Sequence, residues 1–151
     1  MKVRARAAMK AARFYAKWYP MKLLPLDPNT KGQSLHPTLQ GEMDAIARLS
    51  RKLARTLFHA MALNGPKLEK LQVLLGRFVD VGSELFVWSC AVAHAESKIV
   101  GADLNSAEVE KLIKLVRYFG KLTRSRVAEL FRSVRSNADG EGYTVAKALM
   151  E

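Results

Sequence analysis

The sequence predicts an all-α protein: an antiparallel helical bundle of three long helices, with a basic amphipathic helix before it and a short C-terminal helix after it. Apolar residues return every three or four positions over long stretches. Proline is confined to positions 20–66, so no proline interrupts the later helices. With 151 residues, 49% hydrophobic and 26% charged, the chain is large enough for one domain with its own core.

Residues 1–26 are predicted to form a basic amphipathic segment that binds a membrane or a partner, with a helix over 2–19. Seven cations lie between Lys2 and Lys22, and no acid balances them. At helical spacing most cations share one face and the aromatic side chains lie opposite, which is typical of a helix in a membrane interface. A helix docked on a protein through its aromatic face is the open alternative. The predicted membrane-binding residues are Lys2, Arg6, Lys10, Arg13, Phe14, Lys17, Trp18 and Tyr19.

A linker is predicted over residues 27–36, and the helical bundle over 37–151. The first bundle helix should begin at Pro37, because proline is favoured in the first turn of a helix. Asn64 and Gly65 should end it. The connection to the next helix is short, so the two helices should be antiparallel neighbours.

The central helix is predicted over residues 66–97. It becomes apolar almost all round after Glu84, so its second half is expected to be buried. Three long helices rarely close a core on every side, so we expect an apolar face to be left for another domain, a second copy or the N-terminal helix. The predicted partner-interface residues are Phe78, Leu85, Phe86 and Trp88.

The last long helix should follow a loop over residues 98–105. Asn105 or Ser106 is the predicted cap, with Glu108 in the first turn. A stop is expected near Asn137, and Thr144 could cap a short last turn. The basic stripe of this helix comprises Lys114, Arg117, Lys121 and Arg124, with Arg126, Arg132 and Arg135 nearby. These cations favour a solvated face or a protein interface, with nucleic-acid binding as the alternative.

No motif predicts a reaction centre, so we expect no catalytic, cofactor-binding or metal-binding residue. Asp80 and Glu84 could face one groove and do acid–base work. The favoured interpretation is that they form ion pairs, for example with Arg77. The single cysteine, Cys90, is expected to be a small buried hydrophobe, which suits a reducing compartment.

The net charge of +11 predicts anionic partners, such as lipid headgroups, nucleic acid or an acidic protein face. The sequence contains no run of 18 apolar residues, so it does not predict a transmembrane helix. The N-terminus lacks the pattern of a secretory signal, whereas a mitochondrial presequence stays open. The expected location is cytoplasmic and peripheral at the inner membrane, or at the mitochondrial inner membrane in a eukaryote.

Two stretches resemble a known family. Residues 34–61 contain a His-Pro pair that starts a long helix, and residues 65–97 form the helix that follows. Both are similar to the C-terminal helical extension of very-long-chain-type acyl-CoA dehydrogenases. The matching residues in the second stretch are Glu69, Arg77, Phe78, Asp80, Leu85, Ala91 and Ser97.

The resemblance implies a helical accessory domain that packs on a flavoprotein core near its dimer interface. It also implies that the basic segment before the His-Pro pair attaches to a membrane. The family's catalytic glutamate and its FAD contacts lie upstream, in the core, so FAD is expected only in a full-length homologue. No catalytic residue carries over to this chain, and we expect no activity of the chain alone. The alternative function is a basic helical bundle that binds nucleic acid or another anionic partner.

Overall fold

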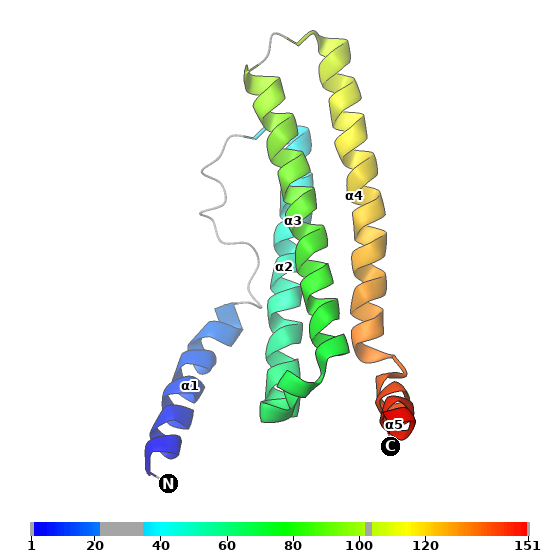
Figure 1. The fold of residues 1–151 in the computed structure, drawn as a ribbon. Helices are drawn as coiled ribbons and strands as arrows, with labels where there is room; N and C mark the ends of the chain where they lie inside the picture. Colours follow the sequence, from blue (N-terminus) through cyan, green and yellow to red (C-terminus); the bar gives the residue numbers. More distant parts are fainter. Residues whose placement is uncertain (1, 22–34, 102–103, 151) are drawn as a thin grey trace. The chain divides into compact units, whose positions relative to one another are not determined.

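A computed structural model describes residues 2–21, 35–101 and 104–150 (Figure 1). These residues form α-helices and one 3-10 helix, which confirms the predicted all-α class. The chain divides into two compact units, Met1–Ser34 and Leu35–Glu151. Residues 22–26 of the predicted basic segment and 27–34 of the predicted linker lie outside the described residues. The elements are α1 (Lys2–Met21), α2 (Pro37–Asn64), the 3-10 helix η2 (Gly65–Lys70), α3 (Gln72–Gly101), α4 (Ser106–Arg135) and α5 (Asp139–Met150).

Helix α1 is the described part of the first unit, and it ends two residues later than predicted. Alanine and long basic side chains dominate its sequence, and both favour a helix. Pro20 lies within its last turn.

Helix α2 begins at Pro37 and ends at Asn64, as predicted. The backbone N–H of His36 donates to Glu96 Oε2 at 3.0 Å, which ties the start of α2 to the far end of α3. This contact fits the antiparallel arrangement of the two helices (Figure 1). Gly65 terminates α2 with φ of +50°, a conformation that favours glycine.

The central helix starts later than predicted. Residues 65–70 form η2, and Leu71 adopts φ −89° and ψ 61°, so the α-helix restarts at Gln72. Helix α3 then continues to Gly101, four residues beyond the predicted end. The prediction of one continuous helix from residue 66 was wrong, because apolar spacing alone does not distinguish a 3-10 turn from an α-turn.

Helix α4 begins with a complete capping box, which confirms the predicted cap. Asn105 Oδ1 accepts hydrogen bonds from the N–H groups of Ala107 and Glu108, both at 3.0 Å. The carboxylate of Glu108 accepts the N–H of Asn105 at 3.0 Å in return. Together these bonds satisfy backbone donors that the first turn leaves open.

The C-terminal helix is longer than predicted, and Thr144 does not cap it. Helix α5 spans Asp139–Met150, and Thr144 lies inside it with its hydroxyl donating to the carbonyl of Gly140 at 2.9 Å. Asn137 Oδ1 accepts the N–H of Asp139, the first residue of this helix, at 3.1 Å. The prediction of Thr144 as a cap was wrong.

Helix α3 packs against both α2 and α4, and these helices run side by side (Figure 1). The main core contains residues of all three: Leu39, Ala45, Ile46, Val81, Leu85, Trp88, Val92, Ala95, Val116, Val127 and Phe131. The second half of α3 is nevertheless not buried all round, because two neighbouring helices cover only part of its surface. Phe86 is 68% exposed and Val87 is 51% exposed. Cys90 is also exposed, so the prediction of a buried cysteine was wrong.

Candidate functional site

Helix α1 presents both cations and apolar groups at its surface. Arg6, Lys10, Arg13 and Lys17 are exposed, and Phe14 is 60% exposed. The rings of Phe14 and Tyr15 meet edge to face with centroids 5.3 Å apart, and those of Tyr15 and Trp18 at 5.9 Å. Trp18 and Tyr19 are half-buried. No helix among the described residues is long and apolar enough to cross a bilayer.

The predicted partner-interface residues occupy two different environments. Phe78, Leu85 and Trp88 lie inside the bundle, with exposures of 5%, 4% and 0%. Phe86 points away from the core and is 68% exposed. Val79, seven residues before Phe86 and therefore on the same side of α3, is 66% exposed. We call the surface of Val79 and Phe86 the apolar face of α3.

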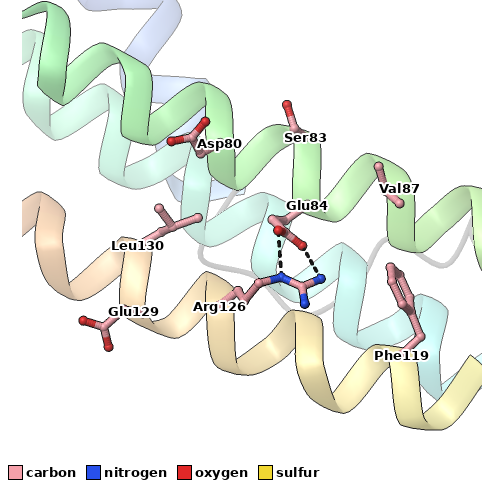
Figure 2. Close-up of a pocket in the computed structure, with 8 residues that line it drawn as sticks. All are labelled: Asp80, Ser83, Glu84, Val87, Phe119, Arg126, Glu129 and Leu130. Atoms are coloured by element: carbon pink, nitrogen blue, oxygen red, sulfur yellow. Dashed lines mark hydrogen bonds and ion pairs between the residues drawn. The ribbon is translucent and has the colours of Figure 1, made fainter.

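A groove of about 600 Å³ lies between α3 and α4 (Figure 2). Asp80 and Glu84 both line it, as the sequence predicted, together with Val87, Phe119 and Leu130. Glu84 Oε1 and Oε2 accept hydrogen bonds from Arg126 Nε and Nη2, both at 2.8 Å. This bidentate bond raises the pKa of the Arg126 guanidinium.

Glu84 is therefore an ion-pair partner and not a free base. The favoured interpretation of this carboxylate as paired was right, but the partner is Arg126 of α4 and not Arg77. Both oxygens of Glu84 are occupied by the guanidinium, so the acid–base pair considered for Asp80 and Glu84 does not form. The sequence offered no signal for this pairing, because the two residues are 42 positions apart.

A second groove, of about 380 Å³, lies between α2 and α4. Its cationic lining consists of Arg48, Lys52, Arg55 and Arg124. Leu49 and Phe131 supply apolar surface, and Lys52 Nζ lies 4.2 Å from the centroid of the Phe131 ring. We call this the basic groove. The spacing of 48, 52 and 55 on one side of a helix is a signal that the sequence carried.

A buried polar cluster joins the three bundle helices. Glu42 of α2 is 6% exposed, and its Oε2 accepts from Arg124 Nη2 of α4 at 2.8 Å. The Arg124 guanidinium also lies 4.7 Å from the ring centroid of the fully buried Trp88 of α3. Arg124, which was predicted to belong to the basic stripe of α4, keeps 39% of its side chain exposed while it bonds to Glu42.

Gly120 makes this cluster possible. A methyl group on Gly120 would clash with Glu42 Oε2 and lie 2.9 Å from Trp88 Nε1. The indole N–H of Trp88 has no hydrogen-bond acceptor within the described part of the chain. A glycine inside a long helix is a sequence signal for such close packing.

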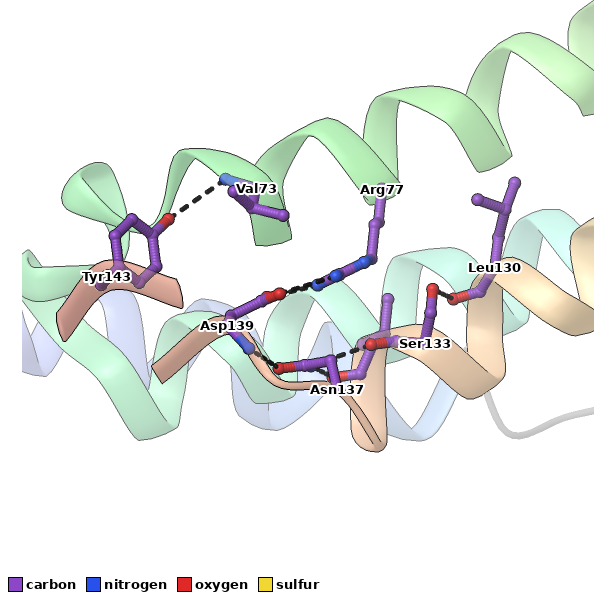
Figure 3. A network of polar contacts seen from close by, with 8 residues as sticks. Val73, Arg77, Leu130, Ser133, Asn137, Asp139 and Tyr143 are labelled. Carbon is purple, nitrogen blue, oxygen red and sulfur yellow. Dashed lines mark hydrogen bonds and ion pairs between the residues drawn. The ribbon is translucent and has the colours of Figure 1, made fainter. Parts of the chain in front are cut away.

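Arg77 anchors the C-terminal helix and does not pair with Asp80 or Glu84. Its Nη2 donates to Asp139 Oδ1 at 2.7 Å, and Nη1 bonds to the other carboxylate oxygen (Figure 3). The hydrogen bonds from Arg77 lower the pKa of the Asp139 carboxyl, and the carboxylate raises the pKa of Arg77. One turn away, the hydroxyl of Tyr143 accepts the N–H of Val73 at 3.3 Å. These contacts fasten α5 to the start of α3.

Other cations of α4 pair with carboxylates of the same helix. Lys114 pairs with Glu110 on the surface of α4, and Arg132 pairs with Glu129. Within residues 2–21, 35–101 and 104–150, no group of three His, Cys, Asp or Glu side chains is placed to hold a metal ion. The site is thus a set of surfaces: an amphipathic helix, an apolar face and two grooves.

Comparison with known proteins gives one set of relatives. The chain is 35% identical, over an alignment of 158 residues that includes its whole length, to the probable acyl-CoA dehydrogenase FadE10 of Mycobacterium bovis. The proteins of the same name from two strains of Mycobacterium tuberculosis match equally well. The chain covers 23% of each relative, in its C-terminal part, so it spans about a quarter of their length. This similarity confirms the resemblance to the C-terminal region of acyl-CoA dehydrogenases. No family model and no solved structure matches the chain.

Proposed function

We propose that this chain is the non-catalytic C-terminal accessory domain of an acyl-CoA dehydrogenase of the fatty acid β-oxidation type. Its role is to dock on the flavoprotein core, to support oligomerisation and to attach the assembly peripherally to a membrane. The observation that carries the proposal is the similarity of the whole chain to the C-terminal part of probable acyl-CoA dehydrogenases. In this proposal FAD belongs to the core, and the chain supplies contacts only.

The apolar face of α3 supports the docking role. Val79 and Phe86 are each about two-thirds exposed although they lie on the central helix of the bundle. Covering apolar surface contributes about 25 cal/mol per Å², so a partner that buries both side chains gains affinity there. Aromatic side chains are also frequent anchors of interfaces. We propose that the flavoprotein core covers this face.

The docking role can be tested with a single charge placed on that face. The partner is the Mycobacterium tuberculosis relative from which the matched C-terminal part has been removed, and the chain is added to it in solution. Phe86→Asp should weaken binding by about 30-fold, the loss typical of a buried interface anchor. The matched control is Ser125→Asp, which adds the same charge on the exposed side of α4. Equal affinity of the two variants would exclude this face as the docking surface.

The membrane role rests on α1. Each cation near an anionic membrane surface contributes about 1 kcal/mol, so the four exposed cations of α1 suffice for weak, salt-sensitive attachment. Phe14 gives the same helix an exposed aromatic group. We propose that α1 lies in the interface plane with its cations toward the lipid headgroups.

Vesicle flotation of the full chain tests this role. Replacing Lys10, Arg13 and Lys17 by Gln should release the chain from anionic vesicles at low salt. The control replaces Lys111, Arg117 and Lys121 of α4 by Gln, which removes the same charge from another exposed surface. Retention by neutral vesicles as strong as by anionic ones would contradict the electrostatic mechanism.

A further inference from the structure

The basic groove between α2 and α4 concentrates positive charge without a carboxylate among its lining residues. From this lining we propose that the groove binds a ligand with closely spaced phosphate groups, such as a diphosphate or triphosphate. The inference concerns a surface distinct from α1 and from the apolar face of α3. It does not depend on the proposed accessory role.

The spacing of the cations fits a row of phosphates. Arg48, Lys52 and Arg55 follow one another at intervals of four and three residues, so they share one side of α2. The row extends over about 10 Å along the helix axis, at 1.5 Å per residue. Arg124 faces this row from α4 across the groove. Like charges brought together in this way repel one another, and a bound polyanion would relieve the repulsion.

Two of the four cations are held in place by contacts that the bundle already makes. Arg124 is fixed by its bond to Glu42 at 2.8 Å and by the Trp88 ring at 4.7 Å. Lys52 lies over the Phe131 ring at 4.2 Å. Side chains that are oriented before the ligand arrives lose less conformational freedom on binding, which increases affinity.

Two of the lining cations, Arg48 and Lys52, have no carboxylate among the residues that line the groove. The charge of Arg124 is balanced by its bond to the carboxylate of Glu42, which is not a lining residue. Arg48 and Lys52 therefore add positive charge for which the lining offers no acidic partner. The apolar side chains of Leu49 and Phe131 also line the groove and lower the local dielectric constant. This strengthens the attraction between the cations and an anion.

The test is calorimetric titration of the full chain with sodium tripolyphosphate at low and at high salt. The double variant Arg48→Gln, Lys52→Gln should bind about tenfold more weakly than the unaltered chain. The control is Arg117→Gln, Lys121→Gln, which lowers the net charge equally on the exposed surface of α4 and should change affinity less than about twofold. Circular dichroism of both variants establishes that the bundle is still folded.

A second arm identifies the source of the phosphates. Vesicles containing phosphatidylinositol 4,5-bisphosphate, a lipid whose headgroup carries closely spaced phosphates, are presented to a chain in which Lys10, Arg13 and Lys17 are already Gln. Retention that Arg48→Gln, Lys52→Gln abolishes assigns the groove to a lipid headgroup, whereas binding of tripolyphosphate alone assigns it to a soluble ligand. The proposal would be overturned if the groove variant and the α4 control lost equal affinity for tripolyphosphate. It would also be overturned if the chain bound neither tripolyphosphate nor the vesicles.

Discussion

Arg124 of α4 and Glu42 of α2 form an ion pair with 2.8 Å between Nη2 and Oε2, and the same guanidinium lies over Trp88 of α3. One side chain thereby contacts a residue on each of the other two bundle helices. The pair is asymmetric, because the side chain of Glu42 is 8% exposed and that of Arg124 is 39% exposed. It links the three bundle helices at one point, and Arg124 also lines the basic groove.

Glu42→Ala should destabilise the bundle by about 1–3 kcal/mol, the cost of leaving a charged hydrogen-bonding group without its partner. The larger cost of breaking a fully buried pair is not expected, because Arg124 is partly exposed and can reach water. Urea unfolding followed by circular dichroism measures the change. As a control, Glu129→Ala breaks a surface pair with Arg132 and should change stability by less than about 0.5 kcal/mol.

Gly120→Ala should also destabilise the protein, by about 1–3 kcal/mol, because the added methyl group overpacks the space between Glu42 and Trp88. Gly76→Ala is the matched control in α3, where an added methyl group meets no atom within 4 Å. That substitution should stabilise the helix by about 0.5–1 kcal/mol. Stabilisation by both substitutions would show that Gly120 is not closely packed.

The docking of α5 should depend on pH through Asp139. The pKa of Asp139 is lowered in the folded protein by its hydrogen bonds from Arg77. The ion pair therefore contributes fully above the ordinary Asp pKa of about 4, and the contribution is lost as pH falls through the lowered pKa. The amide resonance of Val73, whose N–H donates to Tyr143, reports α5 docking during an acid titration. Asp139→Asn should abolish this transition, and its persistence in that variant would assign the pH dependence to another group.

Cys90 should react with a thiol reagent while the protein stays folded, because its side chain is exposed on α3. Complete labelling without loss of helical circular dichroism is the expected result. Cys90→Ser is the control for non-specific reaction. Labelling that occurs only in denaturant would show that the cysteine is covered.

The sequence predicted helix boundaries best where a residue with a strong preference for a helix start stands at the boundary. Pro37 and Asn105 mark helix starts through preferences that act within one turn, and both were confirmed. The break at Leu71 was missed because the apolar repeat continues through it. The start of α5 was missed because Gly140 and Gly142 disfavour a helix locally, whereas the ion pair between Asp139 and Arg77 supplies a tertiary contact.

The surfaces were harder to predict than the helices. The run around Phe86, Val87 and Trp88 is uniformly apolar, so its composition cannot tell which side chain faces the core. Ion pairs such as Glu84 with Arg126 join residues far apart in the chain, and local spacing carries no information about them. Predicting the basic groove would have required both the spacing of the cations on α2 and the position of Arg124 on α4 across from them. Only the spacing can be read from the sequence.

We propose above that this chain docks on the flavoprotein core of an acyl-CoA dehydrogenase. The most direct measurement mixes the full chain with the Mycobacterium tuberculosis relative lacking its matched C-terminal part, and separates the mixture by size-exclusion chromatography with light scattering. We expect one peak whose mass includes both proteins and whose visible absorbance is that of flavin. Two separate peaks at concentrations that detect a micromolar complex, with all flavin absorbance in the relative's peak, would contradict it.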